Sequence, residues 1–309
     1  MSVAINNYQH LKQLDSINQS LANLDGNVKV SFEFFPPNNE AMSSTLWSSI
    51  KRLEPLAPEF VSVTYGAAAS TRERTHNVIS RILQESHLTP VPHLTCIDST
   101  EQEIEAIAHA YWHQGVRHIV ALRGDKPEGN CKGDFSYALD LIKKLKSLYD
   151  FDISVAAYPE VHPEAPSASF DLDNLKRKVD AGATRAISQF FFNTENFLRF
   201  RDSCEQAQID IELIPGVLPV TNFSQLIKFS KFTNVYIPEW MHKLYQGLEH
   251  DPITRQLIAS HIAIEQVKLL SEEGIDNFHF YTLNRAELTY AICHSLGKRQ
   301  QLQINRKTA

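Results

Sequence analysis

The sequence predicts an α/β fold, a single (β/α)8 TIM barrel with extra helices before its last strand, and three observations lead to this prediction. Short apolar runs rich in β-branched residues alternate with amphipathic helical stretches, which is typical of a parallel sheet covered on both faces. Eight such runs occur, and the chain of 309 residues has the length of a barrel. An open doubly wound sheet also fits the alternation, but the count of eight favours closure.

No low-complexity tract or Pro/Gly/Ser linker interrupts this alternation. The predicted strands are Val28–Pro36, Phe60–Gly66, Val91–Cys96, His118–Asp125, Asp152–Pro159, Arg185–Phe192, Ile211–Gly216 and Phe278–Asn284. We therefore divide the chain into an N-terminal helical segment at residues 1–27, a catalytic barrel at residues 28–298 and a tail at residues 299–309.

Helical stretches lie between the predicted strands. The stretch Thr100–Gly115 opens with a capping box, in which Thr100 is the N-cap and Glu103 follows three residues later, and it ends at a glycine. The stretch from Asp171 to Gly182 is expected to begin and end in the same manner. The interval from Thr221 to Asn277 is too long for one crossover, so we expect additional helices there.

The composition excludes several classes of protein. A net charge of −6 and a pI of about 6.1 give no excess of basic residues to bind a nucleic-acid backbone. No apolar run of about 18 residues is present to cross a membrane, and the N-terminus lacks the apolar core of a signal peptide. The four cysteines are far apart and form no CxxC pair, so we expect reduced thiols in a cytoplasmic protein: Cys96, Cys131, Cys204 and Cys293.

Polar residues gather at the carboxyl ends of the predicted strands, where the active sites of such barrels lie. Every strand but the seventh delivers one. In chain order they are Glu33, Thr64, His93, Arg123 with Gly124 and Asp125, Tyr158 with His162, Gln189, and Tyr281 with Asn284 and Arg285. A purely structural barrel has no use for such a ring, so the pattern predicts an enzyme.

Glu33 also has a structural interpretation, as a buried and paired acid, and taken alone the two interpretations are equal. Burial among Phe32, Phe34 and Phe35 would favour the protonated form of Glu33, which suits a general acid. The residues therefore leave the role of Glu33 open at this point.

The other polar residues have structural interpretations too. Histidines such as His93 and His162 are, taken singly, more often hydrogen-bonding residues than ligands, and Arg123 with Asp125 fits a salt bridge across a turn. The basic run Lys176–Lys178 is usually a solvated helix face, although a basic helix beside a barrel mouth can hold phosphate.

Known cofactor motifs are weak or missing. No HExxH or His-x-His pair gives metal-ligand spacing, and no GxGxxG occurs. The stretch Gly124–Gly129 has the spacing that opens a Walker A loop, but Asn130 and Cys131 stand where Lys and Ser or Thr are required. The residues alone therefore predict no metal, and a barrel enzyme with a polar, anion-binding mouth.

Together the motifs resemble the bacterial methylenetetrahydrofolate reductase family. SFEFFPP, VSVTYG, PHLTC, RHIVALRGD, DISVAAYPEVHPEA, LKRKVDAGA, QFFF, IPGVLP and FHFYTLNRAE occur in family order from Ser31 to Glu287. The resemblance implies a homotetrameric flavoprotein with bound FAD. Such an enzyme reduces 5,10-methylenetetrahydrofolate to 5-methyltetrahydrofolate with NADH by a ping-pong mechanism, and this supplies methyl groups for methionine synthesis.

The resemblance also implies roles for individual residues. Glu33 corresponds to the general acid, and Asp125 to an acid that contacts the pterin near the flavin. Gln189, Gln225, Phe229 and Arg285 correspond to residues that bind the folate, and Gln189 and Phe229 also to positions at the nicotinamide. The implied FAD site consists of Thr64, His93, Arg123, Gly124, Asp125, Tyr137, Ala138, Tyr158, His162, Asp171, Asn174, Arg177 and Lys178.

Three other functions compete with this interpretation. Another flavin barrel, such as a proline-dehydrogenase-like enzyme, would share the fold and cofactor. A metal-dependent barrel lyase would use Glu33, His93 and Asp125 as ligands and would be colourless. A folate-binding protein without catalysis would bind ligand but not turn over NADH.

Overall fold

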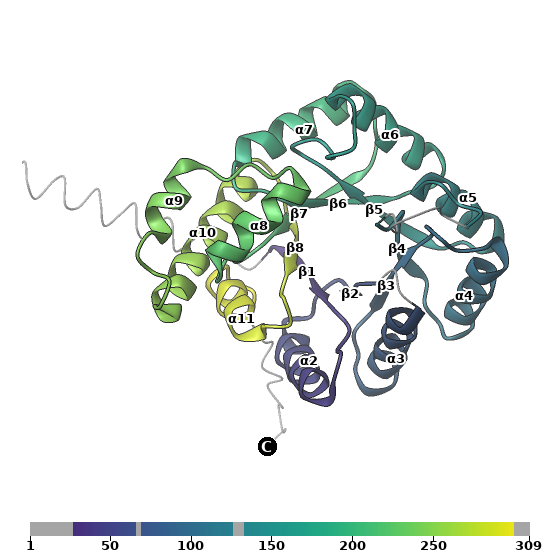
Figure 1. Ribbon diagram of the computed structural model, residues 1–309, viewed down its shortest axis with the longest axis horizontal. Coiled ribbons are helices and arrows are strands. Elements are labelled where there is room, and N and C mark those ends of the chain that lie inside the picture. The colour runs from purple at the N-terminus through teal and green to yellow at the C-terminus, as the bar shows by residue number, and fades with distance from the viewer. Residues whose placement is uncertain (1–26, 66–68, 126–132, 300–309) are drawn as a thin grey trace, which may run out of the picture.

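The computed structural model describes residues 27–65, 69–125 and 133–299. Within them, eight parallel strands close into a barrel in the order β1-β2-β3-β4-β5-β6-β7-β8, which confirms the predicted fold (Figure 1). The strands are β1 Lys29–Phe34, β2 Val61–Val63, β3 Pro90–Thr95, β4 His118–Leu122, β5 Asp152–Ala157, β6 Arg185–Phe190, β7 Glu212–Val217 and β8 Asn277–Tyr281. The expected N-terminal helical segment up to residue 26, Cys131, and the tail after residue 299 lie outside the described residues.

All eight predicted strands are present, but most of them end sooner than predicted. β4, for example, ends at Leu122, and Arg123 and Asp125 belong to the loop that follows. Beyond the last hydrogen bond between neighbouring strands, the sequence still resembles that of a strand, because the residues that follow line the mouth of the barrel. The predicted overruns therefore fall on the residues that form the site.

Helices cover the outside of the barrel. They are α2 Glu40–Leu53, α3 Ala69–Glu85, α4 Glu101–His113, α5 Ala138–Leu148, α6 Ala168–Asp180, α7 Thr194–Gln206, α8 Phe223–Thr233, α9 Glu239–Tyr245, α10 Pro252–Glu272 and α11 Ala286–Ser295, with a short 3-10 helix at Glu54–Leu56. The capping box of α4 is confirmed, because Glu103 N donates to Thr100 Oγ1 at 3.3 Å and Thr100 N donates to the Glu103 carboxylate at 2.8 Å.

The predicted start of α6 at Asp171 is wrong by one turn. Ser167 is the N-cap, and its hydroxyl accepts a hydrogen bond from Phe170 N at 3.1 Å. Both Ser and Asp are good N-cap residues, and the helix begins at the first of them. Asp171 instead lies inside the first turn, where its carboxylate is available to the preceding loop.

The long interval before the last strand holds α8, α9 and α10, as expected, and these helices lie together on one side of the barrel (Figure 1). A second, smaller apolar core attaches them to the ends of β6 and β7. Its buried members are Phe190, Phe192, Val220, Leu226, Val235, Met241 and Tyr245. This core is separate from the main one. It packs α8 and α9 together at the mouth of the barrel.

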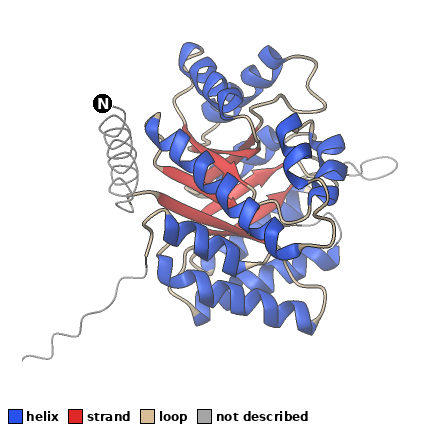
Figure 2. Cartoon of the chain, turned by 90° about the vertical axis from the view of Figure 1, so that its left-hand side faces the viewer, coloured by secondary structure: helices blue, strands red, loops and turns tan. Residues whose placement is uncertain are grey.

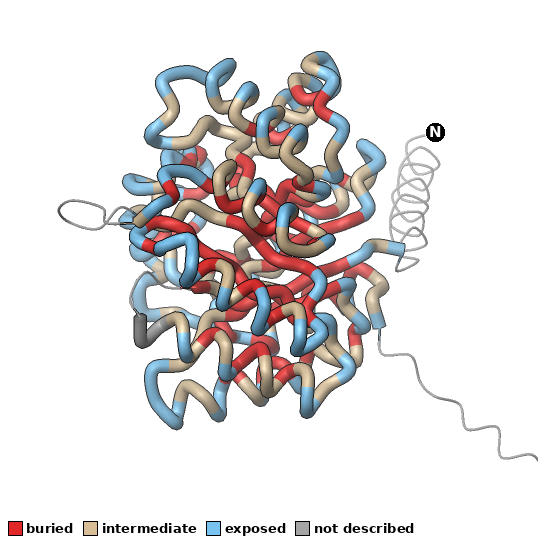
Figure 3. The backbone as a smooth tube through the Cα atoms, turned by 90° about the vertical axis from the view of Figure 1, so that its right-hand side faces the viewer, coloured by how far each residue is buried: buried red, intermediate tan, exposed pale blue. Residues whose placement is uncertain are grey.

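The main core lies between the strands and the surrounding helices (Figure 2). Buried positions follow the strands through the centre of the molecule, and the exposed positions lie on the outer helices and loops (Figure 3). Inside the barrel, a separate apolar plug fills the middle and is formed by Phe60, Val91, Val120, Ile187 and Ile214. The interior is therefore packed rather than open.

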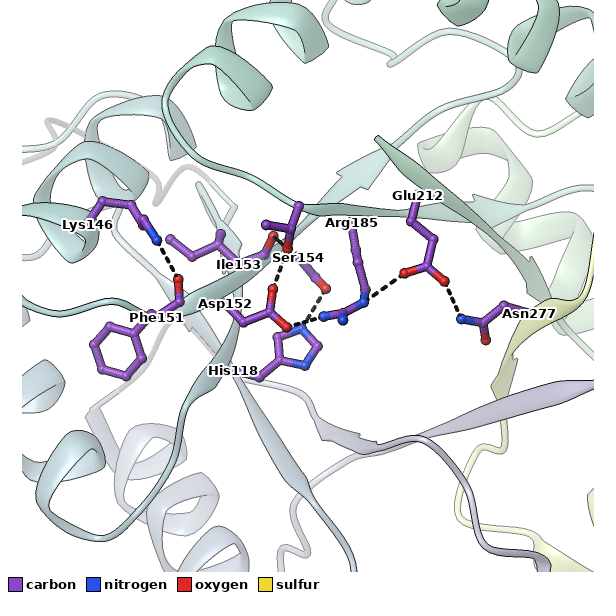
Figure 4. A network of polar contacts seen from close by, with 10 residues as sticks. His118, Lys146, Phe151, Asp152, Ile153, Ser154, Arg185, Glu212 and Asn277 are labelled. Atoms are coloured by element: carbon purple, nitrogen blue, oxygen red, sulfur yellow. Dashed lines mark hydrogen bonds and ion pairs between the residues drawn. The ribbon is translucent and has the colours of Figure 1, made fainter. Parts of the chain in front are cut away.

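A polar network joins strands of the barrel near their amino-terminal ends (Figure 4). Arg185 pairs with Asp152 and also donates through Nε to Glu212 at 2.9 Å. Glu212 accepts a second hydrogen bond from Asn277 at 2.7 Å, while His118 Nε2 lies 2.7 Å from the Ser154 hydroxyl. These side chains come from the amino-terminal ends of β4 to β8, the end of such a barrel that serves stability rather than chemistry.

None of the helices in the described part of the chain is long and apolar enough to cross a membrane.

Candidate functional site

Two adjoining hollows form the mouth of the barrel at the carboxyl ends of the strands. The larger, with a volume of about 750 Å³, is the Glu33 cavity, and the smaller, of about 540 Å³, is the Arg123 hollow. They share the side walls Tyr65, Leu122, Ala156 and Tyr158. Two ligands placed in these hollows would therefore meet at the shared wall.

The structure divides the predicted site residues between the two hollows. The Glu33 cavity is lined by the predicted residues Glu33, Thr64, His93, Tyr158, Gln189, Gln225, Phe229 and Arg285. The Arg123 hollow is lined by the predicted residues Arg123, Gly124, Asp125, Tyr137, Ala138, Tyr158, His162, Asp171, Asn174 and Lys178. Arg177 lines neither of them. Its guanidinium lies 5.8 Å from the ring of Phe170, which is part of the Arg123 hollow.

The Glu33 carboxylate lies between two histidines at the base of its cavity. Its Oε2 is 3.5 Å from His93 Nε2 and 3.8 Å from His279 Nε2, and its side chain is 20% exposed. Burial lowers the pKa of His93, and the nearby Glu33 only partly offsets this effect. His93 is therefore neutral near pH 7 and does not cancel the charge of an ionised Glu33.

His279 is fully buried and is held from behind by the Ser31 hydroxyl. The Ser31 Oγ lies 2.8 Å from His279 Nδ1 and 3.4 Å from the Phe278 carbonyl. When the hydroxyl donates to that carbonyl, Nδ1 carries the histidine proton and an unprotonated Nε2 faces Glu33. The lone pair of His279 Nε2 then lies on the side of the Glu33 carboxylate, 3.8 Å away.

The expected burial of Glu33 among phenylalanines is wrong for two of them. Phe32 and Phe34 are fully buried members of the outer core, on the opposite face of β1 from Glu33. Only Phe35, just beyond the strand, lines the Glu33 cavity. The surroundings of Glu33 are therefore set mainly by His93 of β3 and His279 of the adjacent β8.

Gln189 lines the cavity on the same face as Ile187, two residues before it, and a β-bulge of β6 lies beside it. Ile187 pairs with Ile214 and Phe190 with Gly216, so three steps along β6 match two along β7. The Tyr281 hydroxyl donates to the Ser188 carbonyl at 2.8 Å, and Gly216 N donates to the Ser188 hydroxyl at 2.9 Å. These two bonds hold the extra residue in place.

Gly216 is required where β7 meets this bulge. A Cβ added there would lie 2.3 Å from the Ser188 carbonyl oxygen and 2.6 Å from the Tyr281 ring. Only glycine lets the three strands approach this closely. The bulge, the glycine and the tyrosine therefore form one unit beneath Gln189.

Arg123 holds the wall of the smaller hollow. Its guanidinium makes two hydrogen bonds to the Glu164 carboxylate, at 2.6 and 2.8 Å. Its ion-pair partner is thus Glu164, whereas the structural interpretation of the sequence paired it with Asp125. Gly124 beside it adopts φ +90°, and a Cβ there would lie 2.9 Å from both Thr95 and Ile97. The loop Arg123–Asp125 thus needs Gly124 both for its backbone conformation and for its close packing.

Lys178 brings a basic group to the Arg123 hollow. Its Nζ donates to the Ala156 carbonyl at 3.4 Å, and burial lowers the pKa of Lys178, with Asp171 acting in the opposite direction. Asp171 accepts a hydrogen bond from His162 N at 2.9 Å. The basic run that resembles a solvated face is therefore split, with Lys178 pointing inward and Arg177 exposed.

Two buried hydroxyls of the Arg123 hollow have no hydrogen-bond partner among the residues that the structure describes. They are the Tyr65 hydroxyl and Thr95 Oγ1, and both residues line the hollow. Buried hydroxyls normally find a partner. Together with Arg123 and Lys178, these groups suit a ligand that offers phosphate and other acceptor oxygens.

The metal-lyase alternative requires Glu33, His93 and Asp125 to share one ion. Glu33 and His93 line the larger cavity, whereas Asp125 lines the smaller one. Among the residues that the structure describes, no group of three or more His, Cys, Asp or Glu side chains is placed to hold a metal. The geometry gives this alternative no support.

Sequence reasoning missed two contributors, His279 and Glu164. His279 and the predicted Tyr281 alternate with the buried Phe278 and Phe280, so the period of two along β8 could have placed His279 on the inner face as well. Glu164 had no signal in the sequence, because nothing local indicates that it pairs with Arg123.

Comparisons with known sequences find relatives over nearly the whole chain. The sequence profile of methylenetetrahydrofolate reductase matches residues 16–297. Relatives named 5,10-methylenetetrahydrofolate reductase from Salmonella typhimurium and Escherichia coli are each 59% identical over 293 residues, covering 95% of this chain and 99% of the relative. A relative from Oryza sativa subsp. japonica, named probable methylenetetrahydrofolate reductase (NADH), is 32% identical and covers 96% of this chain and 52% of the relative.

A comparison with solved structures shows the same fold in a more distant protein. An uncharacterized protein from Clostridium thermocellum, described as binding two copies of 5-methyl-5,6,7,8-tetrahydrofolic acid, has a TM-score of 0.61. It is 15% identical and covers 91% of this chain and 97% of that protein.

Proposed function

Because this chain belongs to the methylenetetrahydrofolate reductase family, we propose that it reduces 5,10-methylenetetrahydrofolate to 5-methyltetrahydrofolate with NADH, using bound FAD. The observation that carries the proposal is the placement of Glu33 at the base of a cavity that opens onto the Arg123 hollow. The reaction would follow a ping-pong sequence and supply methyl groups for methionine synthesis.

FAD fits the chemistry of the Arg123 hollow. Lys178 and Arg123, which is paired with Glu164, would supply basic groups for a pyrophosphate. The hydroxyls of Tyr65 and Thr95, which have no partner in the described part of the chain, would supply donors. Asp171, Asn174 and His162, which the resemblance assigns to the FAD site, line the same hollow. When bound, the flavin would supply the two-electron hydride chemistry that no side chain can perform.

Glu33 would act as the general acid. Its proton would go to a nitrogen of the five-membered ring of methylenetetrahydrofolate, so that the ring opens to an iminium that accepts hydride. His279, held by Ser31, would face the Glu33 carboxyl from one side of the cavity base. His93 would assist as a neutral neighbour on the other side of the carboxyl.

The remaining residues of the Glu33 cavity would bind and orient substrate. Gln189 accepts a hydrogen bond from Phe190 N through Oε1, which leaves its amide protons for a pterin or a nicotinamide. Phe229 on α8 is 51% exposed and available for stacking. Arg285 lies at the rim, where its guanidinium would meet the acidic tail of the folate.

One cavity would serve both substrates in turn, because Gln189, Gln225 and Phe229 all line the same space. NADH would bind first and leave as NAD, and the folate would follow. Asp125 lines the other hollow, so its charge would act from the flavin side. A homotetramer remains a prediction from the resemblance, and a cytoplasmic location a prediction from the cysteine pattern.

Steady-state assays of the purified protein test this proposal against its rivals. We expect NADH-dependent reduction of methylenetetrahydrofolate that survives dialysis against a chelator. Proline-dependent dye reduction would point instead to the other flavin barrel, and loss of activity with the chelator to a metal lyase. Tight folate binding with no NADH turnover would identify a binding protein.

A further inference from the structure

The loop between β5 and α6 is tied to the end of α8 by the side chain of Glu160. Its Oε2 accepts a hydrogen bond from Tyr236 N at 2.8 Å, and its Oε1 accepts one from Asn196 Nδ2 at 2.7 Å. Burial raises the pKa of Glu160, and these two bonds act in the opposite direction. A half-buried carboxylate is thus held by two partners from α7 and the α8–α9 loop.

Asn234 fixes the same loop from the other direction. It ends α8 in the left-handed region, with φ +57°, and its Nδ2 donates to the carbonyls of Glu160 at 3.1 Å and Val161 at 3.2 Å. Val161 itself has φ +70°, a conformation that a β-branched residue avoids. Such a conformation persists only where the surroundings impose it, and Asn234 holds both carbonyls that flank the residue.

Residues close to Glu160 reach the Arg123 hollow. Tyr158 and His162, two residues before and two residues after Glu160, both line that hollow. Their rings contact each other edge to face with centroids 4.5 Å apart. Glu164, two residues further on, accepts the two hydrogen bonds from Arg123.

Residues close to Asn234 reach the Glu33 cavity. Gln225, Phe229 and Thr233 recur every four residues along α8 and all line the cavity. This spacing places them on one face of the helix, turn after turn. Asn234, the residue after Thr233, therefore fixes the end of the helix whose face forms the cavity wall.

We propose that Glu160 and Asn234 form a clasp that couples the two hollows, so that a ligand in the Arg123 hollow changes the affinity of the Glu33 cavity for its ligand. The inference rests on the proposed function, which assigns a flavin to the first hollow and a folate to the second. Both ends of the clasp are hydrogen bonds between elements that carry lining residues. A shift of the β5–α6 loop is thereby transmitted to α8, and by linkage the effect is reciprocal.

The test compares FAD binding with and without a folate that does not react. Kd for FAD is measured by quenching of flavin fluorescence, alone and with saturating 5-formyltetrahydrofolate, on the full chain. The ratio of the two Kd values is the coupling. The variants are Glu160→Ala, which removes the carboxylate, and Asn234→Gly, which keeps the left-handed backbone but removes the amide.

Two control variants make comparable changes outside the clasp. Glu195→Ala removes a carboxylate next to Asn196 that pairs with Arg199 on the surface. Gln208→Gly releases another non-glycine residue with positive φ, +54°, at the end of α7. Circular dichroism and the thermal midpoint identify any variant that has not folded.

We expect a coupling of about fivefold or more in the unmodified protein, within the usual range for linked sites. Both clasp variants should lower it below about twofold, while the controls keep the unmodified value. The clasp is overturned if the unmodified ratio is one, or if folded Asn234→Gly protein keeps the full coupling. Absence of FAD binding by the unmodified protein would instead contradict the proposed function itself.

Discussion

The chemistry proposed for Glu33 depends on side chains that lie far from it in the sequence. His93 comes from β3 and His279 from β8, and their Nε2 atoms approach the same carboxylate oxygen. These distances are longer than ordinary hydrogen bonds, so the carboxyl is surrounded but not tightly held. A group in this state is free to turn toward a substrate and give up a proton.

Replacing Glu33 by Gln separates the two halves of the reaction. Reduction of the flavin by NADH needs no protonation of a substrate nitrogen and should stay close to the unmodified rate. Oxidation of the reduced flavin by methylenetetrahydrofolate should slow by about 10²–10⁴-fold, the usual contribution of a general acid. Anaerobic stopped-flow absorbance measures both steps, with Glu40→Gln on the outer helix α2 as the control. Equal impairment of both steps would refute the acid assignment.

At the scale of elements, the order and type of the strands and helices were predictable because their periodicities are strong. The ends of the elements were harder to predict, because residues such as Arg123 extend a β-like run without pairing in the ladder. Ser167 and Asp171 illustrate the same limit, since both can cap a helix and the sequence does not say which one does.

The bulge of β6 could not be predicted from the sequence, for a different reason. A bulge is defined by how two strands pair, and neither Ser188 nor Gln189 carries a local signal for it. The alternation along β8 does place Tyr281 inside the barrel, but only the fold brings its hydroxyl to Ser188. Positioning of Gln189 is therefore a property of three strands together.

Tyr281→Phe tests whether the unit formed by the bulge, Gly216 and Tyr281 affects substrate binding by positioning Gln189. Loss of the hydroxyl leaves the Ser188 carbonyl without its partner, so we expect KM for methylenetetrahydrofolate to rise several-fold, equivalent to about 1 kcal/mol. In a Gln189→Ala background the same substitution should change KM by less than about twofold, because residues that act as one unit are not additive.

Steady-state kinetics of the single and double variants give this coupling. Tyr149→Phe is a matched control, since its hydroxyl bonds to His109 on the outer surface. Fully additive effects of Tyr281→Phe and Gln189→Ala would show that Tyr281 acts independently, for example by touching the substrate itself.

At the scale of the whole molecule, the barrel interior is divided into levels. The polar network around Arg185 lies near the amino-terminal ends of the strands, the apolar plug fills the middle, and Glu33 with its partners lies at the other end. The sequence predicted the last of these, because strand ends can be read along the chain. It did not predict the split into two hollows, because that depends on which loops meet across the mouth.

The polar network predicts loss of stability in acid. Burial lowers the pKa of His118 to about 4, whereas an unfolded histidine has a pKa of about 6.5. Between these values the unfolded chain binds more protons, so stability falls as pH is lowered from 6.5 toward 4. At pH 5 the contribution of His118 should be on the order of 1–2 kcal/mol.

Thermal unfolding at pH 7 and pH 5 measures this effect. The unmodified protein should lose more of its thermal midpoint on acidification than His118→Gln, which has no proton to take up. His261→Gln, which removes an exposed histidine of α10, should behave like the unmodified protein. An identical pH response in His118→Gln would show that His118 is not the group responsible.

The central claim is that one hollow holds a flavin and the other a folate, and that the reduced flavin passes a hydride to the folate. One spectroscopic experiment tests it. The purified protein should be yellow, with a flavin absorption band that bleaches on anaerobic addition of NADH and returns on addition of methylenetetrahydrofolate. A colourless protein that binds no FAD, or a band that NADH bleaches but the folate does not restore, would contradict it.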